Sequence, residues 1–453
     1  MTPTRLSLPA RAALDAPSRR PMVPSRLMTA LAGLLVALFT VRLGLSVTTA
    51  PVRDPHVAYY QEGRNMIHEI TGTIPADAAR LKVDTQLGAV RIVKRPGGDI
   101  AYRVRVRALG PDMDEARRRL DRMVVGASRE GDLLSFVGAL PKPEADSRGL
   151  GADFDLEIPD SLSEVAITTG AGDIRCLGAP GKVTLMSRAG AIVARDLSGP
   201  LQAETRAGTI TVSGMKHGAR LITAGGDILV GPGDGDLFVR TSGGDVHIGR
   251  IGGKVEAETG GGSVAIEQAS GGVRVASNGG DIQVGESGGE VAASTGGGGI
   301  RVGRAVGGVR CETGAGSIVL DGVNGPLRAL TSAGSIRALL NGNLPGDSDL
   351  QTWHGDVIVT IPDSLPLTVR ALVDNPVGRA IESEFPLTVL REAETTGRPL
   401  EMGEMRIGGG GPLLKLRTLG GRIVIQKVKL VPGTPQPTPE PLPKRDESKP
   451  EFE

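Results

Sequence analysis

Branched aliphatic residues recur every 18 positions through the centre of this chain. They are Ile174, Ile192, Ile210, Ile228, Val246, Val264, Ile282, Ile300, Ile318 and Ile336. Glycine stands two places before each, at Gly172, Gly190, Gly208, Gly226, Gly244, Gly262, Gly280, Gly298, Gly316 and Gly334. Serine or threonine stands five places before each, from Thr169 to Thr331. A fixed period of this length predicts a repeat fold in which equivalent residues stack on one another.

Each unit divides into two halves of nine residues. Nine places after each branched residue comes a second apolar one, in the series Val183, Leu201, Ala219, Leu237, Val255, Val273, Val291, Val309 and Leu327. Apolar residues alternate along each half, as in Val183/Leu185, and glycine-rich segments separate the halves. Such alternation between turn residues predicts β-strands. We therefore expect an all-β chain: a single-chain β-solenoid (β-helix) with 18-residue rungs over residues 161–345.

The composition fits a thin solenoid. The 453 residues include only 6 Phe, 3 Tyr and 1 Trp, and two sheets ~10 Å apart suit Val, Ile, Leu and Ala between them. The ten glycines are expected to be structural turn residues with a positive φ, where a Cβ would clash. The Ser/Thr column either forms a hydroxyl ladder to the turn backbone of the neighbouring rung, or reflects β-propensity alone.

A weaker copy of the unit precedes the regular repeat. Residues 52–160 are expected to form an N-terminal cap module, because an uncapped solenoid exposes the edges of its end strands. This module contains the copy Thr85–Val90. Residues 112–124 have apolar side chains at helical spacing, which predicts one short amphipathic helix among the strands.

Further copies follow the regular repeat. Residues 346–430 are expected to form a C-terminal cap module, with one copy at Thr352–Val357, displaced by a three-residue insertion, and a last copy at Thr418–Ile423. The pentapeptide Ile158–Leu162 recurs as Ile361–Leu365, which indicates related modules at both ends of the repeat.

The first 47 residues have the pattern of a membrane segment. Residues 1–26 contain five arginines against one aspartate, and residues 27–47 carry no charge except Arg42. A helix over 27–47 would be about 31 Å long, enough to span a bilayer, and the basic flank places the rest of the chain outside. We expect 1–26 to be a disordered cytoplasmic end and 27–47 an uncleaved transmembrane signal anchor. The alternative is a cleaved secretory or twin-arginine signal.

Beyond the second cap module, residues 431–453 are rich in proline and charge, which predicts a disordered tail.

Several segments together resemble a known family. They are the repeated T-x-x-G-x-I units, the pentapeptide IPDSL, the segment Gly378–Pro386 and the closing TLGGRIVI at 418–425. In these the chain is similar to the bacterial putative-adhesin family of β-strand-repeat (β-solenoid) domains, largely of unknown function, over roughly residues 68–428. The resemblance implies an envelope protein with this fold and implies no catalytic residues.

Acidic residues recur in one turn column, at Asp173, Asp227, Asp245 and Asp281. Carboxylates on adjacent rungs could share Ca²⁺. Other rungs have Ala, Thr, Ser or Gly in this column, so we expect ordinary turn aspartates instead.

The remaining candidate metal ligands are few. The five histidines, His56, His68, His217, His247 and His354, lack ligand spacing, and we expect them to be surface or turn residues.

The two cysteines, Cys176 and Cys311, should point into the core seven to eight rungs apart. Because a disulfide requires Cα atoms within about 7 Å, we expect two buried thiols.

The outward positions of one sheet carry charges of both signs. One column runs Thr184, Gln202, Arg220, Phe238, Glu256, Arg274, Ala292, Arg310 and Arg328. Its neighbour runs Met186, Glu204, Ile222, Arg240, Glu258, Ala276, Ser294, Glu312 and Leu330. With one aromatic residue among them, these columns favour a solvated face with ion pairs between rungs. A sugar-binding face or an acidic-ligand site on the arginines is the alternative.

These features together predict a non-enzymatic, membrane-tethered envelope protein that presents a rigid β-solenoid for adhesion or scaffolding. The balance of 52 Lys and Arg against 51 Asp and Glu argues against a nucleic-acid partner, and we expect no catalytic, cofactor or metal site. Residues 27–47 would hold the protein in the bacterial cytoplasmic (inner) membrane, with the bulk of the chain extracytoplasmic and an unknown envelope protein or polymer as partner. The alternatives are a polymerising assembly element and a polysaccharide-binding or polysaccharide-active β-helix.

Overall fold

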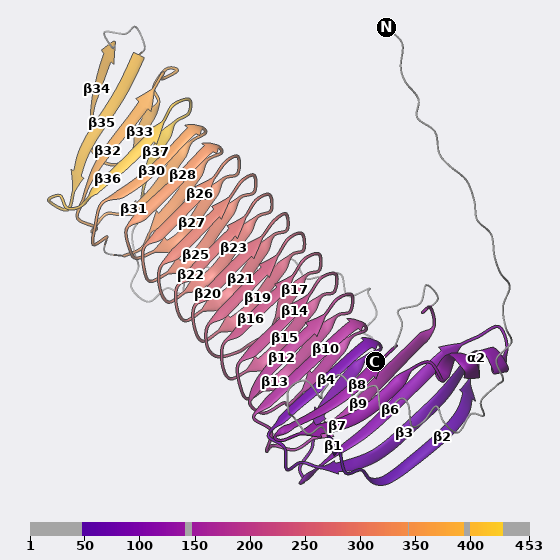
Figure 1. Ribbon diagram of the computed structural model, residues 1–453. Helices are drawn as coiled ribbons and strands as arrows, with labels where there is room; N and C mark the ends of the chain where they lie inside the picture. Colours follow the sequence, from indigo (N-terminus) through magenta and orange to yellow (C-terminus); the bar gives the residue numbers. More distant parts are fainter. Residues whose placement is uncertain (1–47, 141–146, 343, 394–398, 429–453) are drawn as a thin grey trace, which may run out of the picture. The chain divides into compact units, whose positions relative to one another are not determined.

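The computed structural model of the protein describes residues 48–140, 147–342, 344–393 and 399–428 (Figure 1). The expected cytoplasmic end 1–26, transmembrane segment 27–47 and proline-rich tail 431–453 lie outside these ranges. Within them, no helix is both long enough and apolar enough to cross a membrane.

The strands of the regular repeat alternate between two sheets, A and B. Sheet A receives β10 (Glu164–Ala171), β12 (Lys182–Ser187), β14 (Leu201–Thr205), β16 (Ala219–Thr223), β18 (Leu237–Thr241), β20 (Val255–Thr259), β22 (Val273–Ser277), β24 (Val291–Thr295), β26 (Val309–Thr313) and β28 (Leu327–Ala333). Sheet B receives β11 (Ile174–Leu177), β13 (Ile192–Leu197), β15 (Ile210–Met215), β17 (Ile228–Val230), β19 (Val246–Ile251), β21 (Val264–Ala269), β23 (Ile282–Ser287), β25 (Ile300–Ala305), β27 (Ile318–Val323) and β29 (Ile336–Leu340).

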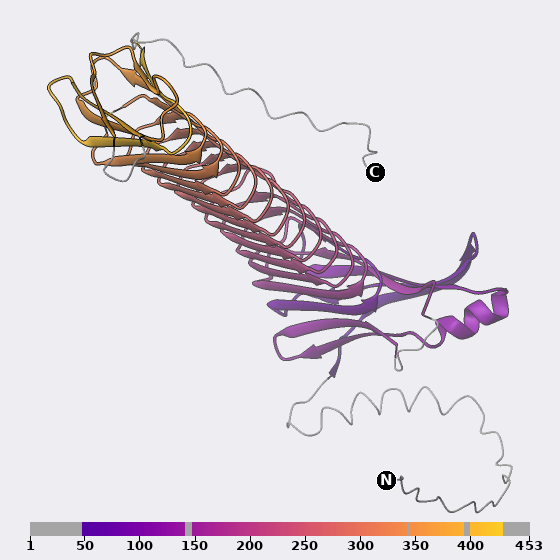
Figure 2. The ribbon, with the colours of Figure 1, turned by 90° about the horizontal axis from the view of Figure 1, so that it is seen from above.

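Strands of the repeat pair in parallel with the strand one rung later. In sheet A, Val183 lies beside Leu201, and in sheet B, Ile174 lies beside Ile192, an offset of 18 residues in both sheets. Figure 2 shows the resulting coils following one another through the regular repeat. The predicted 18-residue rung is therefore confirmed, and the two sheets form a solenoid-like pair.

Aliphatic side chains fill the space between the sheets of the regular repeat. Phe238 is the single aromatic residue between 161 and 345, and it faces outward between the buried Leu237 and Val239. Rings are instead packed inside the N-terminal module, where Phe136 lies 5.4 Å from Tyr102 and 6.4 Å from Phe154 between ring centroids. Closely stacked sheets explain this division, because ~10 Å of separation suits aliphatic side chains better than rings.

A ladder of buried hydroxyl groups joins the turns of successive rungs. Thr205 Oγ1 donates a hydrogen bond to the carbonyl oxygen of Gly190, 2.9 Å away in the preceding rung, and accepts one from the amide of Gly208. All ten residues of the predicted Ser/Thr column donate in this way to the coil before them. The hydroxyl ladder is thus confirmed, and β-propensity alone does not account for the column.

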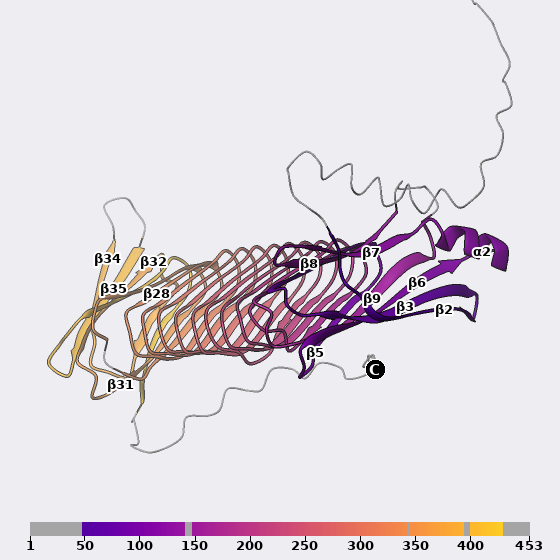
Figure 3. The same ribbon diagram turned by 60° about the horizontal axis from the view of Figure 1, so that its bottom comes forward.

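The N-terminal module extends both sheets. Its elements are β1 (Thr48–Thr49), β2 (Arg53–Glu62), β3 (Asn65–Pro75), β4 (Arg80–Leu87), β5 (Val90–Lys94), β6 (Asp99–Leu109), α2 (Met113–Leu120), β7 (Val124–Glu130), β8 (Leu133–Ala139) and β9 (Leu150–Ile158). Strands β2, β3, β6 and β9 pair antiparallel in that order and continue sheet B, as Figure 3 shows, and α2 packs against β3 and β6.

The short helix of this module forms where it is predicted but ends earlier. Asp112 is its N-cap, and its carboxylate accepts a 2.8 Å hydrogen bond from the amide of Glu115. The helix stops at Leu120, whereas the spacing predicted it through residue 124. Met123 is still buried, but it lies beyond the helix because Val124 already begins β7.

The C-terminal module follows β29. Its strands are β30 (Ser348–His354), β31 (Val357–Pro362), β32 (Leu367–Asp374), β33 (Ile381–Ser383), β34 (Thr388–Ala393), β35 (Pro399–Ile407), β36 (Leu413–Thr418) and β37 (Ile423–Val428). Ala329 of β28 lies beside Leu350 of β30, an offset of 21 residues, which confirms the three-residue insertion. Beyond β32, the antiparallel strands β35 and β34 extend sheet A.

Both modules contain one coil inserted out of sequence order. In the C-terminal module, β36 lies between β30 and β32, and β37 lies between β31 and β33. The copy at Thr418–Ile423 is therefore the last in sequence but not the last in the stack. In the N-terminal module, β4 lies between β8 and β10, and β5 lies between β9 and β11.

The repeated pentapeptide IPDSL stands where the chain passes over each inserted coil. It follows β9 at Ile158–Leu162 and closes β31 at Ile361–Leu365, and the next strand lies on the far side of the inserted coil. A lysine of the inserted coil pairs with the aspartate of each pentapeptide: Lys94 with Asp160 at 2.6 Å, and Lys427 with Asp363 at 3.8 Å. The recurrence thus marks two equivalent crossings.

Candidate functional site

The ten predicted turn glycines are stacked on one another, and their role is structural. A Cβ built on any of them would lie closer than 3.0 Å to the carbonyl oxygen of the glycine in the preceding coil. Among the ten, Gly172 alone has a positive φ, so the expected left-handed conformation is wrong for the other nine. Glycine is required here because two backbones approach closely, and not because of an unusual dihedral angle.

The aspartates of the turn column also bind backbone of the neighbouring rung. Asp227 Oδ1 accepts a 3.0 Å hydrogen bond from the amide of Asp245, and Asp245 Oδ1 accepts one of 2.8 Å from the amide of Ser263. Asp173 and Asp281 do the same. Across the described ranges, no cluster of three or more His, Cys, Asp and Glu residues could hold a metal ion. These carboxylates therefore stabilise the turns, as predicted.

The two outward columns of sheet A lie in register as the sequence predicts. Arg220 is beside Phe238, and Arg240 is beside Glu258. The guanidinium carbons of Arg220 and Arg240 lie 4.2 and 5.5 Å from the ring centroid of Phe238, so the ring lies between two cations.

Ion pairs join side chains along this face. Arg240 Nε donates a 2.7 Å hydrogen bond to Glu258, and Arg310 pairs with Glu312 at 2.8 Å. Exposed pairs of this kind contribute about 0.2–1 kcal/mol each, so they orient the side chains more than they stabilise the fold. We name the cluster Arg220, Phe238, Arg240 and Glu258 the arginine–phenylalanine cluster.

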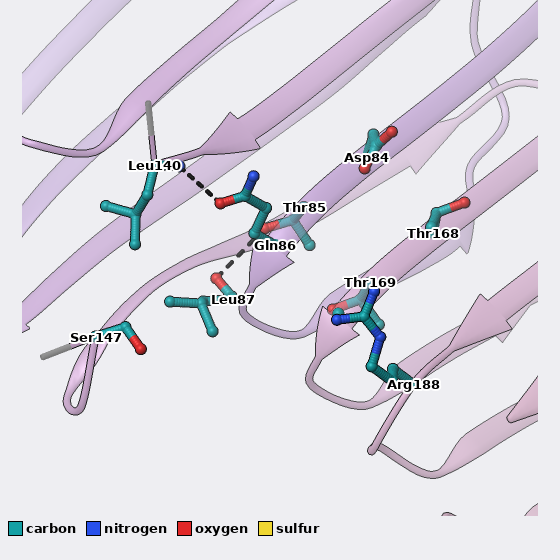
Figure 4. Close-up of a pocket in the computed structure, with 10 residues that line it drawn as sticks. Asp84, Thr85, Gln86, Leu87, Leu140, Ser147, Thr168, Thr169 and Arg188 are labelled. Carbon is teal, nitrogen blue, oxygen red and sulfur yellow. Dashed lines mark hydrogen bonds between the residues drawn. The ribbon is translucent and has the colours of Figure 1, made fainter. Parts of the chain in front are cut away.

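A shallow pocket of about 370 Å³ lies where sheet A passes from the N-terminal module into the regular repeat. Figure 4 shows Asp84, Thr168, Gln86 and Arg188 around it, contributed by β4, β10 and the turn after β12. The Gln86 side chain is held by a 3.0 Å hydrogen bond from the amide of Leu140. Its lining has neither histidine nor cysteine, so the pocket can bind a small polar group but contains no evident nucleophile and base pair.

The histidines do not converge. His56 and His68 belong to the N-terminal module, His217 to a turn, His247 to β19 and His354 to the end of β30.

The ring of His68 stacks on Tyr59 with 4.3 Å between centroids. Burial lowers the pKa of His68, and the nearby charge of Asp121 opposes this shift.

Both cysteines are buried as free thiols, as predicted. Cys176 lies in sheet B and Cys311 in sheet A, on β11 and β26. Burial raises the pKa of each thiol to about 12, so neither forms the thiolate needed for nucleophilic chemistry near neutral pH.

The structure also has a groove on the outer face of sheet B that the sequence reasoning missed. Its volume is about 500 Å³, and Arg195, Ser213, Pro232, His247 and Arg250 are among its lining residues. The signal was present in the sequence: Pro232 stands in a strand column where the neighbouring rungs have no proline.

No protein-family model matches the chain, and the search of curated proteins found no match. Among solved structures the chain is similar to a putative adhesin from Bacteroides fragilis, with 16% identity, 52% of this chain and 96% of that chain covered, and a TM-score of 0.34. It is also similar to a putative cell adhesion protein from Clostridium sporogenes (8% identity, 83% and 99% covered, TM-score 0.15).

A third similar structure is a putative lipid binding protein from Parabacteroides distasonis, with 12% identity, 81% and 98% covered, and a TM-score of 0.17. What this chain does is inferred below from its own residues.

Proposed function

We propose that the chain is a non-enzymatic envelope protein that uses the outer face of sheet A as a rigid surface for adhesion or scaffolding. Residues 27–47 would tether it to the cytoplasmic membrane, with the repeat on the extracytoplasmic side. The partner would be an envelope protein or polymer that contacts several rungs at once.

The observation that carries this proposal is the way in which the rungs are joined. Each hydroxyl of the Ser/Thr column is buried and bonded to the preceding rung, at distances of 2.8–3.1 Å. Turn aspartates add further bonds between rungs. Because these bonds fix the register, side chains on the outer face keep constant spacing from rung to rung, as a contact surface requires.

The chemistry of sheet A supports a binding surface rather than an active site. The arginine–phenylalanine cluster combines an aromatic ring with paired and unpaired guanidinium groups, which are residue types enriched in protein interfaces.

Cell attachment of strains carrying surface variants tests this proposal. The double variant Arg220→Ser/Phe238→Ser removes the centre of the cluster and should reduce attachment while leaving the folded yield unchanged. A matched double variant on sheet B, Arg301→Ser/Arg337→Ser, should attach like the wild type. Equal attachment by all three strains would contradict the proposal, and so would equal losses on both faces.

A further inference from the structure

The rung of residues 226–243 departs from the repeat. Its sheet B strand, β17, has three residues, whereas β15 and β19 on either side have six. After Val230, the segment Gly231–Gly233 leaves the ladder, and only Gly233 forms isolated bridges, to Met215 and Ile251. Proline is normally excluded from the interior of a sheet because it lacks the N–H that the ladder requires. Pro232 in a central rung therefore marks a local exception to an otherwise regular stack.

The groove described above lies directly over this exception. Gly231 and Gly249 occupy the outward column in which Arg195, Ser213 and Glu267 have side chains, so a hollow opens between those side chains. The fold does not require glycine at 249: a Cβ there would approach no atom closer than 3.4 Å, and its φ is not positive. Glycine in a strand interior weakens the strand unless something approaches the backbone closely. An approaching ligand would account for it.

Cationic side chains surround the hollow. Arg195, His247 and Arg250 are all exposed, and within the described ranges no carboxylate lies within ion-pair distance of any of them. Arginines elsewhere on the same sheet are paired, as Arg304 is with Glu286 at 3.0 Å. Arg195 stands three rungs before Gly249 in the same column, which separates the two ends of the groove by about 14 Å at ~4.8 Å per rung.

The rest of the lining selects among anions. Thr211 and Ser213 add hydroxyl groups, Leu229 adds apolar surface, and the carboxylate of Glu267 lies at one side. A guanidinium group matches a carboxylate with two parallel hydrogen bonds. The acceptor Glu267 would bind the hydroxyl groups of a sugar but would repel a densely charged anion such as phosphate.

We infer that this groove binds a short segment of a carboxylate-bearing polysaccharide, with Arg195 and Arg250 on its uronate groups. The segment would lie along the stack, across the rungs that begin at β13, β15, β17 and β19, with the backbone of Gly231 and Gly249 beneath it. This site is on sheet B and is independent of the adhesive surface proposed for sheet A.

Binding can be measured by titration calorimetry on the full chain in detergent, with a galacturonic acid trimer as the probe. A neutral galactose trimer and inorganic phosphate serve as competing probes. The acidic trimer should bind, with an affinity that falls as salt concentration rises, and the other two should not. Equal binding of the neutral trimer would overturn the inference, and stronger binding of phosphate would replace the saccharide by a phosphate ligand.

Three variants complete the test. Arg250→Gln should weaken binding of the acidic trimer by roughly tenfold or more, because a charge-assisted hydrogen bond is lost. Gly249→Val should abolish binding by filling the hollow, with unchanged melting temperature. Arg337→Gln, an exposed arginine on β29 outside the groove, is the matched control and should bind like the wild type. Wild-type affinity in Gly249→Val, or equal losses in the two arginine variants, would refute the site.

Discussion

Two adjacent glycines in one turn, Gly261 and Gly262, should respond very differently to alanine. The nearest atom to a Cβ on Gly261 is 4.0 Å away, so the Gly261→Ala variant meets only open space. A Cβ on Gly262 would collide with the carbonyl oxygen of Gly244, and the two turns must separate by about 1 Å before normal contact is restored.

That separation breaks hydrogen bonds between the rungs. Thr259 Oγ1 donates to the carbonyl oxygen of Gly244 at 2.9 Å, and the amide of Ser263 donates to Asp245 at 2.8 Å. A stretch of about 1 Å takes both beyond hydrogen-bonding range. With about 1–3 kcal/mol for each buried group left unsatisfied, Gly262→Ala should lower the free energy of unfolding by about 3 kcal/mol. Gly261→Ala should change it by less than about 0.5 kcal/mol.

Urea titration of the full chain in detergent, followed by circular dichroism, measures both variants against the wild type. A difference of about 2 kcal/mol or more between the two alanine variants is the expected result. If both variants unfold at the same urea concentration, close approach of the backbones is not the reason for glycine in this column.

Other predictions concern the rung, the thiols and the tether. Deleting Val246–Ser263 removes one complete rung and should preserve most of the folded yield, whereas deleting only Val246–Lys254 stacks unlike half-rungs and should abolish it; equal yields would contradict the stacked register. Cys176 and Cys311, with pKa values raised to about 12 by burial, should resist iodoacetamide at pH 8 until urea unfolds the chain, and mass spectrometry of the native protein should find both labelled only if the inward placement is wrong. Membranes washed with carbonate should retain the protein through residues 27–47, and release with a new N-terminus near residue 50 would indicate a cleaved signal instead.

The regular repeat could be predicted from the sequence almost completely, because its information is local and is repeated ten times. Ile174, Gly172 and Thr169 define one rung, and the same three columns recur at every 18th residue. The pairing offset follows directly, since any other offset would place polar residues in the core. The hydroxyl ladder follows from the same columns.

The order of the coils in the two end modules could not be predicted in this way. The copy at Thr418–Ile423 has the same local pattern as any rung, so nothing within it shows that it inserts between β30 and β32. The recurrence of IPDSL was visible, but its meaning depends on contacts between Lys427 and Asp363, which are far apart in sequence.

The candidate sites divide along the same line. The outward columns of sheet A were predicted residue by residue, because strand alternation places them. The sheet B groove was missed because it results from what is absent at Gly231 and Gly249. The reason given for the turn glycines was wrong for a similar cause: close approach of Gly262 to Gly244 is a contact between rungs, which a local dihedral argument does not contain.

The inserted coil of the C-terminal module determines what happens to a chain that is cut short. Strands β36 and β37 come late in the sequence, yet they occupy an interior layer of the stack. A product that ends before Leu413 would not be a shorter stack with an intact end. It would have a missing layer, with the facing edges of β30 and β32 in one sheet and of β31 and β33 in the other left without partners. Open strand edges of this kind pair readily with other chains, so a truncated product should aggregate or be degraded, and cells would accumulate only chains that extend through β37.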